Sequence, residues 1–183
     1  YILSAMERGA SAAQALTQAQ RLGFAEKDPT MDLSGQDTAQ KVSVLAALLT
    51  GVSLAPQKIP REGITRIEAE DVAFALETLK RTPKLLCSLK LHWGARVRAE
   101  AGVFPTLVAQ EHTLAAVRAE YNAVLVKASS ADDLMFYGKG AGAGPTASAV
   151  VGDIFMLSRD LLGGIHPRRP ESAAVDMATA EDA

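Results

Sequence analysis

The sequence has little of two residue types on which whole classes of protein depend. Of its 183 residues, one is cysteine and 5% are aromatic. The lone Cys87 excludes an internal disulfide and indicates a reducing compartment, so we expect a cytoplasmic protein. The scarcity of aromatic side chains, together with a net charge of −2, argues against nucleic acid as a partner, because base stacking needs aromatic surfaces and phosphates need a basic face.

The sequence also lacks a long apolar run and a metal-binding spacing. A membrane-spanning helix needs about 18 or more apolar residues in succession, whereas the run from Val42 to Pro56 is shorter and contains Ser, Thr and Gly. The three histidines, His92, His112 and His166, are far apart and have no cysteine at a ligand spacing. We therefore expect neither a membrane nor a metal ion as a partner.

The composition is that of a globular chain with about one domain. Hydrophobic residues make up 48% of the sequence and charged residues 22%, which supports a sizeable core. The chain begins with Tyr1-Ile2-Leu3, which resembles the inside of a structural element, so we interpret it as a piece of a longer protein. We expect one domain over residues 1–164 and a polar tail or linker over residues 165–183, where periodicity is lost.

Hydrophobic periodicity predicts an α+β fold. We expect helices over residues 2–22, Gln36–Thr50, Glu68–Leu79 and Ala147–Leu162. We expect strands over Lys84–Leu91, Arg96–Val103, Ala123–Lys127 and Leu134–Tyr137, with a short helical insert at Thr106–Val108. The predicted core faces include Val42, Leu45, Ala46, Leu48 and Leu49 in the second helix. In the last helix they include Val150, Val151, Ile154, Phe155, Leu157 and Leu161.

The most informative stretch runs from Glu26 to Lys41, where four carboxylates precede a long apolar segment. Asp37 and Lys41 are four residues apart and therefore share a helix face. One interpretation is an ordinary intrahelical ion pair, worth about 0.3–0.5 kcal/mol, on a capped helix. The alternative is a polar site in which Lys41 exchanges a proton with an alcohol or carbonyl while the spare acids bind a cationic group.

A glycine-rich loop over Gly138–Thr146 is the second candidate. Glycines let the backbone approach a ligand, and the helix that follows offers free N–H groups to an anion. The loop is not followed by the further strand that a nucleotide-binding unit needs, so it is not the fingerprint of such a unit. Two interpretations remain open, a contact with a nucleotide held by another domain and a tight turn that feeds a helix.

Several motifs resemble the homoserine dehydrogenase family. The segment Leu22–Lys41 is similar to its substrate-site signature, through Leu22-Gly23-Phe24-Ala25-Glu26-Lys27-Asp28-Pro29-Thr30, Asp32, Gly35, Asp37, Ala39 and Lys41. Further similarities lie at Glu62-Gly63-Ile64, at Asn122-Ala123-Val124 and at Gly138–Val151. The resemblance covers residues 1–162 and is weakest between Thr82 and Val103.

The resemblance implies an enzyme that interconverts L-homoserine and L-aspartate 4-semialdehyde with NAD(P). It implies a mixed β-sheet with helices packed on one face, forming a homodimer interface, and a preceding nucleotide-binding domain that is absent here and holds most of the cofactor. By motif position, Lys41 is the expected catalytic acid/base, ordered by Asp37, and Glu26, Asp32 and Asp37 are expected at the substrate. Gly142 and Thr146 are the expected contacts to the cofactor.

Two other readings of the resemblance stay open. The chain could be the dehydrogenase part of a bifunctional aspartokinase–homoserine dehydrogenase, which the residues before Tyr1 would decide. It could instead be a non-catalytic dimerisation module that keeps the fold. The combination of Glu26, Asp32, Asp37 and Lys41 argues against that module, because association alone needs no such set.

Overall fold

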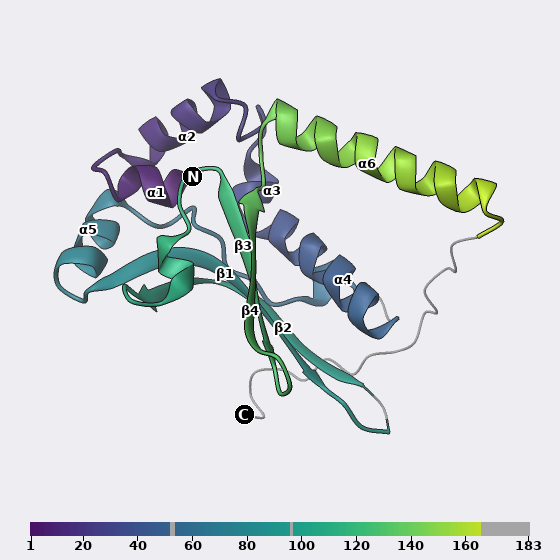
Figure 1. The fold of residues 1–183 in the computed structure, drawn as a ribbon. Coiled ribbons are helices and arrows are strands. Elements are labelled where there is room, and N and C mark those ends of the chain that lie inside the picture. The colour runs from purple at the N-terminus through teal and green to yellow at the C-terminus, as the bar shows by residue number, and fades with distance from the viewer. Residues whose placement is uncertain (52–53, 96, 166–183) are drawn as a thin grey trace. The chain divides into compact units, whose positions relative to one another are not determined.

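The computed structural model describes residues 1–51, 54–95 and 97–165 (Figure 1). The chain forms two compact units. The first contains residues 1–27, 67–84 and 107–165, and the second contains residues 28–66 and 85–106. The division passes through β1 (Arg81–His92) and β2 (Arg98–Ala109), which pair as a two-stranded sheet.

The first unit contains four α-helices, a 3₁₀ helix and a hairpin. Its elements are α1 (Ile2–Met6), α2 (Ala12–Arg21), α5 (Ala69–Glu77), η2 (Thr113–Ala116), β3 (Tyr121–Ala128), β4 (Asp132–Lys139) and α6 (Ala143–Leu162). Helix α1 packs against α2 and α5. The core of this unit is small side chains with a few larger ones, among them Met6 and Val72, each at most 4% exposed.

The single helix expected over residues 2–22 is wrong, because the chain breaks between α1 and α2. Gly9 adopts a left-handed φ of +89°, which glycine tolerates and a helix does not. Ser11 then caps α2: its hydroxyl accepts from the Gln14 backbone N–H, and the Gln14 side chain accepts from the Ser11 N–H. This capping box stabilises a new helix start within a pattern that periodicity alone reads as continuous.

The buried carboxylate of Glu7 links three segments of the first unit through ion pairs. The Glu7 side chain is 7% exposed and pairs with Lys84 Nζ at 3.3 Å and Arg118 Nε at 2.9 Å. Lys84 Nζ also donates to the Val117 carbonyl at 2.8 Å. Burial lowers the pKa of Lys84, and the Glu7 carboxylate opposes that shift. These contacts join α1 to the start of β1 and to the segment before β3.

The second unit contains α3 (Thr30–Leu33), α4 (Gln36–Thr50), η1 (Pro56–Lys58) and most of β1 and β2. Helix α4 begins and ends where the sequence predicts, because Gly35 and Gly51 both adopt left-handed φ at its two ends. Its buried stripe joins β2 in one hydrophobic core, made of Ala39, Val42, Ala46, Leu54, Ile59, Ala99 and Val103. The Ser43 hydroxyl donates to the Leu54 carbonyl within this core.

The α+β class is confirmed, and the strands are longer than expected. Strands β3 and β4 form an antiparallel hairpin whose register pairs Val124 with Phe136. The predicted helical insert at Thr106–Val108 is wrong, since these residues continue β2. A single parallel bridge between Arg61 and Val103 lies beside β2, so the strands form two two-stranded sheets with mixed pairing at one edge.

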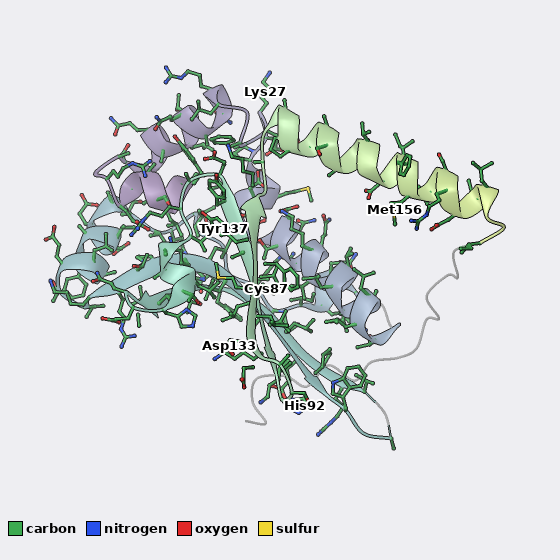
Figure 2. The ribbon with its side chains drawn as sticks, viewed as in Figure 1. Lys27, Cys87, His92, Asp133, Tyr137 and Met156 are labelled. Carbon is green, nitrogen blue, oxygen red and sulfur yellow. The ribbon has the colours of Figure 1, made fainter. Side chains whose placement is uncertain are left out.

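Helix α6 starts at Ala143, four residues before the predicted start, because Gly142 serves as its N-cap with φ +114°. The predicted core face is not buried by any described residue: Val151 is 64% exposed and Phe155 70%. Leu48 and Leu49 of α4 are exposed as well, contrary to expectation. Figure 2 shows the side chains along α6, with Met156 labelled, projecting outward from the helix.

Within the residues that the structure describes, no helix is both long enough and apolar enough to span a membrane. The expected polar tail over residues 165–183 lies, except for Ile165, outside the described residues.

Candidate active site

The acidic stretch is divided between the two units. Glu26 belongs to the first unit, and Asp32, Asp37 and Lys41 belong to the second. The structure therefore brings Asp37 and Lys41 together. Asp32 lies in the same unit as this pair, and Glu26 lies in the other unit.

The start of the stretch is fixed by the end of α2. Gly23 has a φ of +74°, and the Phe24 N–H donates back to the Ala19 carbonyl, which closes the helix in a Schellman turn. The Gln20 side-chain amide donates to the Glu26 carbonyl at 3.0 Å, and the Phe24 ring lies 5.2 Å from that of Tyr1. These contacts hold the Glu26 backbone, while its carboxylate is exposed.

Asp28 is committed to local structure. Its carboxylate accepts from both the backbone N–H and the hydroxyl of Thr30, at 3.1 and 2.5 Å, and so starts α3. The hydroxyl donation is the main reason that the pKa of Asp28 lies below its usual value. The Asp28 carboxylate therefore helps to build the turn that leads into α3.

Asp37 and Lys41 form an ion pair on the exposed side of the first turns of α4. Lys41 Nζ lies 2.5 Å from Asp37 Oδ2, and the Lys41 side chain is 62% exposed. Between them in sequence, Ala39 is fully buried in the core, so the same two turns present a fixed apolar face and a free polar face. The ammonium is thus held by a carboxylate and remains accessible to a ligand.

Gly142 and Thr146 lie together at the start of α6. The Thr146 N–H donates to the Gly142 carbonyl at 3.1 Å, so Thr146 is in the first turn of the helix rather than at its cap. An open groove of about 660 Å³ runs beside them. Its lining is mostly small or apolar and includes Leu22, Gly23, Gly142, Ala143, Thr146 and Ala147. The end of α2 and the glycine loop therefore share one surface of the first unit.

Two supports of the glycine loop escape the sequence analysis. The Gly140 N–H donates to the Glu120 carbonyl at 2.9 Å, and a Cβ on Gly140 would lie 1.7 Å from Nδ2 of Asn122. Lys139 holds the Glu120 carboxylate at 3.0 Å, which lowers the pKa of Glu120 and raises that of Lys139. The Asn122-Ala123-Val124 motif indicates the family resemblance. The sequence does not show, however, that the Asn122 side chain packs against Gly140, 18 residues later.

Two of the three histidines, His92 and His112, have structural partners, and His166 lies outside the described residues. His92, labelled in Figure 2, has its Nε2 2.6 Å from a Glu100 carboxylate oxygen across the β1–β2 pair. His112 Nδ1 accepts from the Leu114 N–H. Among the described residues, no group of three or more potential ligands could hold a metal ion. The second unit therefore offers a lysine–carboxylate pair, and the first unit offers a mostly apolar groove beside the glycine loop.

Comparisons with known proteins find a single family. A sequence model of the family described as homoserine dehydrogenase matches residues 1–155. The homoserine dehydrogenase of Mycobacterium tuberculosis is 44% identical over 182 residues, which cover 97% of this chain and 41% of that protein. That of Synechocystis is 42% identical, covering 96% of this chain and 40% of the relative.

A solved structure extends the likeness to the fold. The homoserine dehydrogenase of Thiobacillus denitrificans matches with a TM-score of 0.83 and 36% identity, covering 97% of this chain and 42% of that one. The chain thus spans about two fifths of the length of the relatives that it matches.

Proposed function

The chain belongs to the homoserine dehydrogenase family, and from that premise we propose that it is the substrate-binding and catalytic part of an NAD(P)-dependent enzyme. The enzyme interconverts L-homoserine and L-aspartate 4-semialdehyde. The observation that carries the proposal is the Asp37–Lys41 pair, which stands on the exposed face of α4 inside the region matched to the family.

In the proposed reaction the neutral amine of Lys41 takes the proton from the substrate hydroxyl during oxidation, and the ammonium so formed returns that proton during reduction. General acid–base catalysis of this kind contributes about 10²–10⁴-fold to the rate. Asp37 holds the Lys41 ammonium in place at 2.5 Å. Glu26 and Asp32 supply carboxylates for the substrate ammonium, a role that needs exposed acids such as Glu26.

The first unit offers a surface that fits one end of a dinucleotide. The groove at Gly142 and Thr146 has a mostly apolar lining, and its two glycines, Gly23 and Gly142, let a planar ring approach the backbone. When bound, the dinucleotide accepts hydride from the alcohol carbon or returns it to the aldehyde carbon. We assign most of its binding to an upstream nucleotide-binding domain, because the described residues hold no strand–glycine turn–helix–strand unit.

The proposal includes a homodimer and a cytoplasmic location. Apolar side chains are exposed on both strands of the β3–β4 hairpin, Phe136 at 65% and Val124 at 41%, and surfaces of this kind mark protein–protein contacts. The lone thiol of Cys87 suits a reducing compartment. Size-exclusion chromatography with light scattering on the full-length protein tests the dimer, and a monomer at micromolar concentration would contradict it.

Substitution of Lys41 tests the catalytic role. In the full-length enzyme, Lys41→Ala is expected to lower kcat by at least about 10²-fold, and Lys41→Arg is not expected to restore it, since a guanidinium does not release its proton. Lys127→Ala is the matched control, because Lys127 also pairs with an aspartate, Asp133 at 3.8 Å, on an exposed hairpin. A near-normal kcat for Lys41→Ala would remove Lys41 from its role.

The same full-length protein separates the enzyme from a non-catalytic module. Binding of L-homoserine, measured by calorimetry, would support the enzyme over the non-catalytic module. The sequence before Tyr1 decides between a single dehydrogenase and a bifunctional aspartokinase–homoserine dehydrogenase. All the relatives compared above are named homoserine dehydrogenase, which favours the single enzyme.

A further inference from the structure

The turn between α3 and α4 is clamped by a second segment of the same unit, residues 60–64. The Ile64 N–H donates to the Leu33 carbonyl at 2.8 Å, which ties this segment to the end of α3. On its other side, the Glu62 N–H donates to the Val103 carbonyl at 2.8 Å, and the Val103 N–H donates to the Pro60 carbonyl at 3.0 Å. The segment therefore lies between β2 and the turn that starts α4.

Gly63 is the tightest point of this clamp. A Cβ at position 63 would lie 1.9 Å from the Leu33 carbonyl oxygen and 2.6 Å from Ser34 Cα. Both neighbours are backbone atoms, and Cβ atoms essentially never approach closer than 3.0 Å. Any side chain at position 63 must therefore force this segment and the α3–α4 turn apart by about 1 Å.

Val103 closes the clamp from the opposite side. It is fully buried, and a Cβ on Gly35 would lie 3.0 Å from Val103 Cγ1. Gly35 is the N-cap of α4, two residues before Asp37, and its carbonyl accepts the Ala39 N–H at 3.0 Å. The position of the first turn of α4 is thus set from both sides by close backbone packing.

We propose that Gly63 is a positioning residue for Lys41, acting through the α3–α4 turn. The inference rests on the proposed function, since it assumes that Lys41 handles the substrate proton. A displacement of about 1 Å at the start of α4 carries Asp37 and Lys41 with it, and a misplacement of that size can cost about 10²-fold in rate. Gly63 itself contributes no chemistry, because it has no side chain.

A double-mutant cycle in the full-length enzyme tests the inference. We expect Gly63→Ala to lower kcat at least about tenfold per folded molecule, with folding measured by circular dichroism. In the Lys41→Ala background, the same substitution should change the residual kcat less than about twofold, because the group that it displaces is gone. Gly152→Ala is the control, since a Cβ there meets nothing within 4 Å.

A normal kcat per folded molecule for Gly63→Ala, or an equal loss with and without Lys41, overturns the positioning role and leaves the proposed function intact. A near-normal kcat for Lys41→Ala overturns both. If Gly63→Ala does not fold, Val103→Ala makes the opposite change by leaving space behind Gly35. It should lower kcat several-fold with Lys41 present and not without it, and an unchanged kcat would refute the inference.

Discussion

Helices α4 and α6 begin in the same way and end up in opposite environments. Each follows a glycine with positive φ, +77° at Gly35 and +114° at Gly142, and each carries candidate site residues in its first turns. Helix α4 buries Ala39, Val42, Ser43 and Ala46 against its own unit. Helix α6 buries no residue among those that the structure describes, although its residues are on average at least as apolar as those of α4.

The difference shows that starting a helix and positioning it are separate problems. A glycine and an apolar repeat suffice to start both helices. Only α4 meets a matching surface within its unit, where Val103 and the segment at Gly63 fix its first turn. Described residues of the second unit therefore position Asp37 and Lys41, whereas the glycine loop of the first unit leads into a helix that no described residue buries.

The largest expected effect concerns the uncovered half. We expect the isolated 183-residue chain to show no sustained turnover with L-homoserine and NAD(P), because the described residues contain no strand–glycine turn–helix–strand unit to hold the rest of the dinucleotide. Formation of NAD(P)H, followed by absorbance, is the measurement, with the full-length enzyme as the control. Sustained turnover by the isolated chain would show that the groove at Gly142 is complete as it stands.

A matched pair of isoleucines measures how differently the two regions are packed. Ile59 is 2% exposed in the core beneath α4, and Ile154 is 58% exposed on α6. In the isolated chain, Ile59→Ala should lower the free energy of unfolding by about 2–5 kcal/mol. Ile154→Ala should change it by less than about 0.5 kcal/mol. Urea unfolding provides both values, and equal losses would mean that α6 packs against something after all.

Sequence reasoning succeeds where local rules decide the outcome. It places α4 at the correct residues because both of its ends are glycines, and it pairs Asp37 with Lys41 because four residues make one helical turn. It fails at Gly9 to Ser11, where a capping box divides an apolar pattern, and at Thr106, where a polar residue lies within a strand. Periodicity also marks an apolar face on α6 without showing what covers it.

The contacts that sequence reasoning misses link residues distant in the chain. The approach of Gly63 to Leu33, 30 residues earlier, and of Gly140 to Asn122 depends on tertiary packing. Family resemblance includes both glycines in its motifs but assigns them no contact. The division of the acidic stretch between two units likewise has no signal in the sequence between Lys27 and Asp28.

Asp37 distinguishes a functional ion pair from an ordinary one. If Asp37 serves to hold Lys41, Asp37→Asn in the full-length enzyme should lower kcat about five- to tenfold. The free energy of unfolding should fall by less than about 1 kcal/mol, as for exposed pairs in general. Asp133→Asn is the control, since Asp133 pairs with a lysine at a greater distance on the β3–β4 hairpin. A kcat unchanged by Asp37→Asn would reduce the pair to helix stabilisation.

The smallest expected effect tests how dry the core behind α4 is. Cys87 packs against that core from β1, and burial raises the pKa of its thiol from 9.0 to about 11 (Figure 2). The unfolded thiol ionises near its usual pKa while the folded thiol stays protonated. Its contribution to stability is therefore complete below pH 9 and is lost as the pH rises toward 11.

Urea unfolding at several pH values between 8 and 11, in parallel with Cys87→Ala, isolates this contribution from the titration of lysines and tyrosines. We expect the wild type to lose slightly more stability than Cys87→Ala across this range, because only the wild type must keep a half-buried thiol protonated. Parallel pH profiles would mean that water reaches the thiol in the folded chain. The core behind the Lys41 helix would then be as open as the face of α6, and the contrast between the two helices would be smaller than their burial suggests.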